Sequence, residues 1–391
     1  MDNLDVAKAA HAGLEGSSWL DGFYKKLDDW MTRPELYRKS ISNPVTRWFT
    51  QRRTQQIFDL MSGFVHSQVL LACVKLNIFT IVKQSPATLE ELSSRCRVPA
   101  PVLQRLLLSA VALRLLEHRG SQRFGLGALG APLAAHEGIR AMVEHNNLLY
   151  QDMAEPLEFL RDAWRGDMAS YWTYAHSEAP AQDSKRDAAQ VGRYSALMAA
   201  SQNFVIEEIL GAYSFHKHHC MMDVGCGMGR FVAAVAQREQ HLTCKLFDLP
   251  AVLDLAQKSH TALGIDSRMH YCPGSFFDDP IPHGADLITL VRVAHDHSDA
   301  AVIKILKNIH SALPAGGALL LAEPMAQEPG DKPLADAYFH LYLLAMGSGR
   351  FRTPSELSAM LTESGFASVE QVPNAMPIHT RILLARKSTA A

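Results

Sequence analysis

The segment Met-Met-Asp-Val-Gly-Cys-Gly-Met-Gly, residues 221–229, is the clearest indication of how this chain folds. An apolar strand runs into three alternating glycines, Gly225, Gly227 and Gly229, and a helix is expected to begin near Arg230. Glycine lets the backbone turn sharply and approach a ligand closely. The start of a helix offers free N–H groups and the positive end of the helix dipole. The segment therefore predicts a strand–turn–helix unit that binds a ligand.

A second motif, Phe-Asp-Leu-Pro at residues 247–250, indicates what kind of ligand this is. Asp248 ends the next expected strand, where an acid accepts hydrogen bonds from ribose hydroxyls, and Leu249 follows it. The G-x-G-x-G spacing differs from the G-x-G-x-x-G that suits a dinucleotide. With Asp223 two residues before the first glycine, it favours S-adenosylmethionine, which has no phosphate. A nicotinamide oxidoreductase, or a plain strand–helix connection, is the alternative.

The bulk composition is that of a globular protein with a full core. The 391 residues suffice for two domains, and 48% of them are hydrophobic and 20% charged. The net charge of −2 implies no general affinity for nucleic acid. The six scattered cysteines form no C-x-x-C pair, which favours reduced thiols in a cytoplasmic protein. We find no signal-peptide pattern and no apolar run of the roughly 18–20 residues that cross a membrane.

From Cys220 onward, expected strands alternate with expected helices. Such alternation predicts a Rossmann-like α/β fold, a doubly wound and mostly parallel sheet with its ligand at the carboxyl ends of the strands. The last two strands pair as an antiparallel hairpin. We expect strands at 220–225, 243–248, 268–273, 285–293, 317–323, 367–373 and 380–387, and helices at 230–238, 250–264, 299–313, 334–347 and 354–364.

The preceding region is expected to be helical, with a winged-helix-like part. Residues 64–74 predict one buried helix. Thr88 is expected to be the N-cap of the next helix, with Glu91 three residues later, and residues 102–116 predict a further helix. A hairpin around Gly120 follows. A DNA-binding ligand sensor is an alternative, although the chain lacks a basic stripe. A long helix over 190–210 leads to the glycine segment, and we divide the chain into domains 1–195 and 196–391.

Near the N-terminus, residues 19–31 carry apolar side chains at helical spacing. Two interpretations are open. The helix packs on a partner subunit or on its own domain, or it lies on a membrane surface, because Trp and Tyr favour interfaces and three arginines follow nearby, Arg47, Arg52 and Arg53.

The strongest candidate for chemistry is His295, which follows the fourth expected strand in Val-Ala-His-Asp-His-Ser-Asp. At the mouth of the sheet, a histidine can take a proton from a substrate hydroxyl. A helix-capping cluster and a metal site with His297 are the other interpretations. Glu323 ends the fifth strand and can orient the far nitrogen of His295, or it is an ordinary charge at a strand end.

The expected helix over 334–347 is apolar nearly all round. Such a helix is either deeply buried or forms an apolar wall of a ligand site. Its candidate substrate contacts recur at i, i+4 and i+7: Phe339, Leu343 and Met346.

Taken together, these motifs resemble the plant-type family of O-methyltransferases that use S-adenosylmethionine. The resemblance covers about residues 55–387, and local stretches are most similar to the bacterial carotenoid branch. The motifs that carry it are Asp223–Gly229, Phe247–Pro250, Gly274–Phe277, His295–Asp299, Ala322–Glu323, Ser67–Val74, Tyr194–Gln202 and Asp336–Gly347.

The resemblance implies an obligate homodimer, His295 as the base and Glu323 as its orienting partner. It also implies Gly225 and Asp248 as cofactor contacts and Met198 as a wall of the transfer site. We expect the acceptor to be hydrophobic, and the first candidate for the methylated group is the tertiary C-1 hydroxyl of an acyclic carotenoid. We also expect a cytoplasmic protein that makes peripheral contact with a photosynthetic membrane, where such an acceptor resides. A bacteriochlorophyllide carbon or a phenolic natural product is the alternative acceptor.

Three positions depart from the family pattern. His297 stands where the family usually has Trp. Ser275 replaces a common acid, so the adenine contact at Ser275 and Phe276 is weaker or comes from the acids that follow. Val291 replaces a common lysine. Arg292 is the neighbouring cation and a candidate cofactor contact, although a strand directs it to the other face.

Overall fold

The computed structural model describes residues 18–162, 166–171, 202–331 and 335–389. The chain forms two compact units, Met1–Leu70 and Leu71–Ala391. The expected domain boundary at 195/196 and the first part of the expected helix over 190–210 lie outside the described residues. The remainder of that helix is confirmed, since residues 202–212 are helical.

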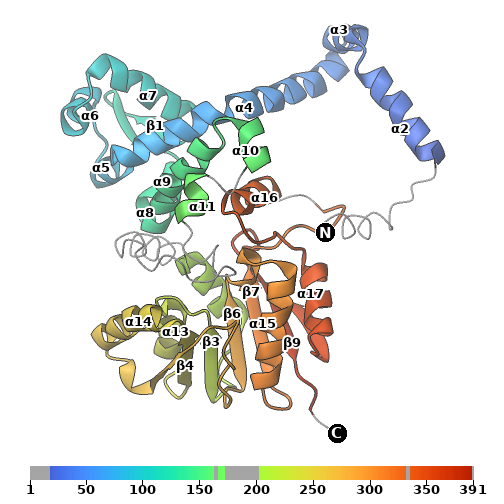
Figure 1. Cartoon of the computed structure of the whole chain (residues 1–391). Coiled ribbons are helices and arrows are strands. Elements are labelled where there is room, and N and C mark those ends of the chain that lie inside the picture. Colours follow the sequence, from blue (N-terminus) through green and yellow to red (C-terminus); the bar gives the residue numbers. More distant parts are fainter. Residues whose placement is uncertain (1–17, 163–165, 172–201, 332–334, 390–391) are drawn as a thin grey trace. The chain divides into compact units, whose positions relative to one another are not determined.

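The first unit is helical. It contains α2 (Ser18–Met31), α3 (Pro34–Ser42) and most of α4 (Pro44–Lys75), drawn in blue in Figure 1. Pro34 and Pro44 each begin a helix, where the missing N–H of proline costs no hydrogen bond. The helix expected over 19–31 is confirmed, and more than half of the Phe23, Tyr24 and Trp30 surfaces is exposed.

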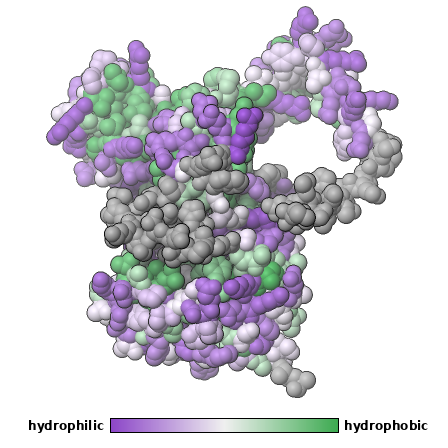
Figure 2. Space-filling model, viewed as in Figure 1, coloured by the Kyte–Doolittle hydropathy of each residue, from purple (hydrophilic) through white to green (hydrophobic). Residues whose placement is uncertain are grey.

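Helix α4 is longer and more exposed than expected. The prediction of one buried helix over 64–74 was correct only for its end, where Leu71, Cys73 and Val74 are buried. Phe64 and Val65 are exposed, and Figure 2 shows apolar residues at the surface along α4. These side chains form an apolar face that a partner subunit can cover.

Within the described residues, α4 is also the one helix whose length and composition would allow it to cross a membrane. The expectation that no stretch approaches such a span was therefore wrong. The expectation was wrong because it looked for an uninterrupted apolar run. Polar residues such as Asp59 and His66 interrupt the run in α4, but its average hydropathy stays as high as that of a membrane-spanning helix. A single such helix is weak evidence for a span, because helices that pack on protein pass the same test.

The second unit begins with the expected winged-helix-like part: α5 (Ile78–Gln84), α6 (Leu89–Cys96), α7 (Ala100–Ala112), β1 (Leu116–Arg119) and β2 (Arg123–Leu126). Thr88 and Glu91 form the predicted capping box of α6. The helix expected to reach residue 116 ends at Ala112, because Arg114 has a left-handed backbone with φ 59° and Leu116 enters the hairpin. Helices α8 (Gly130–Ala135), α9 (Glu137–Asp152), α10 (Pro156–Asp162) and α11 (Asp167–Tyr171) follow.

A seven-stranded sheet forms the rest of the unit, in the order β5-β4-β3-β6-β7-β9-β8. The first five of these strands are parallel, and β9 pairs antiparallel with β8, as predicted, and also with β7, which was not predicted. The strands are β3 (Cys220–Val224), β4 (Thr243–Asp248), β5 (Met269–Pro273), β6 (Leu287–Val291), β7 (Ala318–Glu323), β8 (Ser368–Val372) and β9 (Arg381–Arg386).

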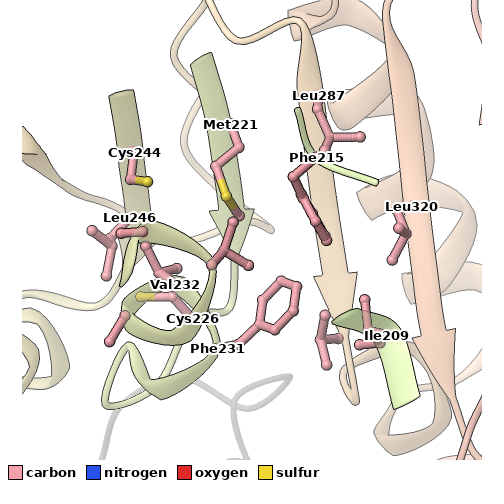
Figure 3. Close-up of a cluster of buried hydrophobic side chains, with 14 of the residues drawn as sticks. Ile209, Phe215, Met221, Cys226, Phe231, Val232, Cys244, Leu246, Leu287 and Leu320 are labelled. Atoms are coloured by element: carbon pink, nitrogen blue, oxygen red, sulfur yellow. The ribbon is translucent and has the colours of Figure 1, made fainter. Parts of the chain in front are cut away.

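Helices cover both faces of this sheet (Figure 1). Because successive strand residues point to opposite faces, Met221 belongs to one buried cluster and Met222 to the other. The first cluster contains residues of α13 (Arg230–Arg238) and α14 (Pro250–Leu263), and Figure 3 shows Phe231 and Val232 packed beside Met221. The second contains α15 (Asp299–Ala312) and α17 (Pro354–Glu363). Helix α16 (Asp336–Ala345) packs elsewhere, against α9.

Candidate active site

Two loops meet where the strand order reverses. Strand β3 lies between β4 and β6, so the chain runs outward from β3 to β4 and β5 and then returns to β6 on the other side. The carboxyl ends of β3 and β6 flank the crevice in which doubly wound sheets bind ligands. The glycine segment leaves β3 at this edge, and His295 follows β6 in a short 3-10 turn, Ala294–Asp296.

The glycine loop has the backbone that a close ligand requires. Gly225, Gly227 and Gly229 all have positive φ, at 70°, 54° and 68°. A Cβ on Gly225 would lie 2.8 Å from a methyl of Val293, and one on Gly229 would lie 2.6 Å from the ring of His260. Only glycine satisfies both the conformation and the space.

Asp248 joins this loop to the end of β4. Its Oδ2 accepts the N–H of Gly227 at 2.8 Å, and its Oδ1 accepts the N–H of Leu249 at 2.7 Å. Burial raises the pKa of Asp248 to about 6, against the lowering effect of these two hydrogen bonds. Each oxygen of a carboxylate keeps a further lone pair, so Asp248 can still accept ribose hydroxyls.

Asp223 is the more deeply buried acid. It is 2% exposed, and its Oδ1 accepts the hydroxyl of Thr289 at 2.6 Å. Burial raises its pKa to about 7, opposed by the Thr289 hydrogen bond and assisted by the charge of Asp248. Two acids that resist ionisation therefore lie next to the glycine loop, where a cationic or hydroxyl-bearing ligand would stabilise their charge.

The polar groups of the loop after β5 form hydrogen bonds mainly with one another. The N–H of Ser275 donates to Asp279, and its hydroxyl donates to Asp278. Phe276 lies near the glycine loop, with a ring carbon 3.6 Å from the position of a Cβ on Gly225. The adenine contact expected from this loop stays a prediction, with Phe276 in the better position.

His295 lies between two carboxylates. Its Nδ1 is 3.4 Å from Oε2 of Glu323, which also accepts the His295 main-chain N–H at 3.0 Å. Its Nε2 is 3.3 Å from Oδ1 of Asp296. All three side chains are buried. The pairing of His295 with Glu323 matches the expectation, whereas the contact of Asp296 with the second ring nitrogen was not predicted.

The two carboxylates change the acidity of the imidazole. Burial lowers the pKa of His295, but Asp296 and Glu323 together raise it above its ordinary value. Burial raises the pKa of Asp296 to about 6, and the charges of His295 and Arg292 oppose that effect. The site can therefore hold a proton on His295 once it has been taken from an acceptor.

A second loop supports the turn that carries His295. Arg352 is 1% exposed and donates to the carbonyl oxygens of Ala294, at 2.9 Å, and His297, at 2.7 Å. Gly349 approaches so closely that a Cβ would lie 2.1 Å from the His295 carbonyl oxygen. Sequence reasoning missed this support, because neither residue belongs to a local motif.

His297 packs as an aromatic residue. Its ring centroid is 5.6 Å from that of Phe276 and 5.1 Å from that of Phe277, with edge-to-face geometry. Burial lowers its pKa to about 4, and the charges of His295 and Arg352 act in the same direction. The neutral imidazole thus fills a place in which an indole would also pack.

Arg292 follows β6 with a left-handed backbone, φ 56°, which is strained for a large side chain. Arg292 acts on two buried groups: burial lowers the pKa of His145 to about 4 and the charge of Arg292 adds to this, whereas burial raises the pKa of Asp296 to about 6 and the charge of Arg292 opposes it. Its expected cofactor role stays a prediction.

The apolar candidates in and directly after α16 pack in one cluster with the buried residues Leu149 and Phe351. Leu343 and Met346 are buried, and Phe339 stacks on Phe351 with ring centroids 5.0 Å apart. Their substrate role stays a prediction, and Met198 lies outside the described residues.

Sequence reasoning also missed two polar contacts between α9 and α16. Nε2 of His145 lies 3.2 Å from the hydroxyl of Tyr342, and the hydroxyl of Tyr338 donates to Asn146 at 2.8 Å. The tyrosines, four residues apart on an apolar helix, were the available signal. Their partners lie almost two hundred residues earlier in the chain.

Comparisons with known proteins agree with this geometry. A family model described as an O-methyltransferase domain matches residues 150–367, and one described as an O-methyltransferase dimerisation domain matches residues 58–135. The chain is 37% identical over 334 residues to demethylspheroidene O-methyltransferase of Cereibacter sphaeroides, covering 85% of this chain and 87% of the relative. It is also 37% identical over 344 residues to the enzyme of that name from Rhodobacter capsulatus, covering 88% and 85%.

The fold is shared with solved structures. The crystal structure of human N-acetylserotonin methyltransferase in complex with SAM has a TM-score of 0.70 at 24% identity, covering 86% of this chain and 98% of that one. This chain belongs to the O-methyltransferase family that carries an N-terminal dimerisation domain. It is a methyltransferase that uses S-adenosylmethionine, and it forms a homodimer.

Proposed function

We propose that this enzyme methylates a hydroxyl oxygen of an apolar acceptor, the tertiary C-1 hydroxyl of an acyclic carotenoid. The observation that carries the proposal is the 37% identity, over most of the chain, to two relatives named demethylspheroidene O-methyltransferase. The apolar cluster around α16 supports it, since a long hydrocarbon needs an apolar wall.

The loops after β3 and β4 would hold the cofactor. The backbone at Gly225 and Gly227 leaves room for it, Asp248 would bind the ribose hydroxyls, and Asp223 would favour the positively charged amino-acid end. Leu249 and Phe276 would contact the base. When bound, S-adenosylmethionine supplies an electrophilic methyl group. The protein's own contribution is to align the acceptor in a site without water, which is worth up to about 7–11 kcal/mol.

His295 would act as the general base. A tertiary alcohol is too weakly acidic to ionise beforehand, so the acceptor oxygen loses its proton to Nε2 of His295 as it gains the methyl group. Glu323 keeps the proton on Nδ1, so Nε2, which also faces Asp296, is the nitrogen that would take up the second proton. Asp296 and Glu323 then stabilise the imidazolium that forms.

The acceptor can be identified directly. The purified dimer is incubated with methyl-labelled S-adenosylmethionine and, separately, with a 1-hydroxycarotenoid in detergent, a bacteriochlorophyllide and a set of phenols. The expected result is a single labelled methyl ether on the carotenoid only. Labelling of the bacteriochlorophyllide or the phenols, with none on the carotenoid, would overturn the proposed acceptor but leave the methyltransferase class intact.

A carotenoid resides in membranes, and we propose that the protein is cytoplasmic and reaches its acceptor by peripheral contact with a photosynthetic membrane. Helix α2 exposes Phe23, Tyr24 and Trp30, and the guanidinium of Arg52 lies over the ring of Trp48, 5.6 Å from its centroid. Aromatic and basic side chains of this kind favour the membrane interface.

Liposome sedimentation tests the contact. The variant Phe23→Ser/Tyr24→Ser/Trp30→Ser should pellet less with vesicles than the wild type, and a matched variant at exposed charges of the same helix, Lys25→Ser/Asp28→Ser, should not. Both variants must remain dimeric by light scattering. Equal pelleting of all three proteins contradicts membrane contact through α2.

A further inference from the structure

A cluster of metal-ligating side chains lies at the end of the sheet opposite the active site. His216 precedes β3, and Glu239 and His241 lie between α13 and β4. One ligating atom from each residue lies within 4.8 Å of the other two. Nδ1 of His216 is 3.3 Å, and Nδ1 of His241 is 3.8 Å, from Oε2 of Glu239. Tetrahedral coordination at about 2.0–2.1 Å from the ion requires similar separations between ligands.

The hydrogen bonds of His241 prepare it to bind a cation. Its Nε2 lies 3.0 Å from the carbonyl oxygen of His218. Because a carbonyl oxygen can only accept, Nε2 carries the proton and Nδ1 presents its lone pair toward Glu239. A histidine ligand to a metal commonly donates its other ring N–H to a backbone carbonyl in this way.

Glu239 is the fixed member of the cluster. Its side chain is 13% exposed, and its main-chain N–H donates to Val235 at the end of α13. Its own carbonyl oxygen accepts a hydrogen bond from Arg268, whose guanidinium also binds the carbonyl oxygens of Ala236 and Leu242. Arg268 is therefore directed at carbonyl oxygens, and the carboxylate of Glu239 faces the two imidazoles.

We propose that this cluster binds one divalent transition metal ion, with Zn²⁺ as the best match. His216 and His241 would each supply Nδ1, Glu239 would supply Oε2, and water would complete the tetrahedron. Imidazole and carboxylate ligands suit Zn²⁺, and a set of two histidines and one glutamate is an established donor set for it. The ion would tie the loop before β3 to the end of α13 and so stabilise the fold, without a part in methyl transfer.

Calorimetry and thermal unfolding test the site. The full chain, prepared without a histidine tag and treated with a chelator, is titrated with Zn²⁺. We expect one ion per chain and a Tm at least about 2 °C higher with saturating Zn²⁺. His216→Ala and His241→Ala should each weaken binding by at least about tenfold. Their side chains are 79% and 40% exposed, so the folds should survive substitution.

His219→Ala is the matched control. This side chain is 91% exposed in the same loop, and it faces Asp286 instead of Glu239. It should leave both the affinity for Zn²⁺ and the Tm shift unchanged. Absence of stoichiometric binding to the wild type overturns the proposal. So does equal affinity in the double variant His216→Ala/His241→Ala, or a loss in His219→Ala as large as in the two ligand variants.

Discussion

The main-chain N–H of Gly227 donates to Oδ2 of Asp248 at 2.8 Å, so the turn after β3 is held by the acid at the end of β4. The other oxygen of this carboxylate holds the N–H of Leu249. One side chain thus shapes the backbone of two loops and still has lone pairs for a ligand. The motifs that the sequence shows as separate are one structural unit.

Replacement of Asp248 should therefore weaken the cofactor site in two ways. Asp248→Ala removes the acceptor for ribose hydroxyls and releases the N–H of Gly227. Hydrogen bonds to a charged group contribute about 1.5–3 kcal/mol, so affinity for S-adenosylmethionine should fall by at least about tenfold. Calorimetry measures it. Asp254→Ala, at an exposed site on the neighbouring helix, is the control and should bind normally. Unchanged affinity in Asp248→Ala would show that the ribose lies elsewhere.

Replacement of His295 should affect catalysis and spare cofactor binding. A general base contributes typically about 10²–10⁴-fold, so His295→Ala should lose at least tenfold in kcat. Its affinity for S-adenosylmethionine should match that of the wild type by calorimetry. If kcat is also unchanged, the assignment of the base is wrong.

The pH dependence of the wild-type rate provides a second view of His295. The base is active when its imidazole is neutral. Because the neighbouring carboxylates raise the pKa of His295, the rising limb of kcat should lie above 6.5, the ordinary value for histidine. Glu323→Gln removes one of these charges and should move the limb to lower pH. A limb that stays in place would show that Glu323 does not act on the titrating group.

His297 should be replaceable by another aromatic residue. Its pKa of about 4 keeps the ring neutral at pH 7, and its contacts are with Phe276 and Phe277. We expect His297→Phe to retain kcat within about threefold, whereas His297→Ala leaves a cavity and lowers stability by about 1–3 kcal/mol. Urea unfolding and steady-state rates distinguish the two. A tenfold loss of kcat in a stable Phe variant would indicate that His297 takes part in proton transfer.

Asp223 should make the fold less stable at alkaline pH. Its pKa rises from 3.8 to about 7, so its favourable contribution is fully present below pH 3.8 and is lost as the pH rises through 7. Asp223→Asn keeps an acceptor for Thr289 without the buried charge. The free energy of unfolding of the variant, minus that of the wild type, should be about 1–3 kcal/mol larger at pH 8 than at pH 5, since one pKa unit corresponds to about 1.4 kcal/mol. Urea unfolding at fixed protein concentration measures this difference. The same difference at both pH values would contradict this account.

Much of the fold could be derived from the chain itself. The glycine turn, the alternation of strands and helices and the cap at Thr88 are local signals, because period, turn conformation and capping depend on neighbours in sequence. All seven strands of the large sheet lie within two residues of the predicted ranges. The errors fall where tertiary contact overrides a local pattern, as at Leu116, whose apolar side chain enters a hairpin instead of prolonging a helix.

The candidate site divides in the same way. His295, Glu323 and Asp248 could be predicted because each ends or follows a strand, and parallel strands bring such residues to one edge. Other contacts could not be predicted. The support from Arg352 and Gly349 and the pairing of His145 with Tyr342 join segments far apart in the chain. The contact of Asp296 with the second nitrogen of His295 depends on how the turn after β6 packs. Local sequence specifies which backbone conformation a segment prefers. Which side chains then meet, and how burial shifts their proton affinities, is decided only when the layers pack and exclude water.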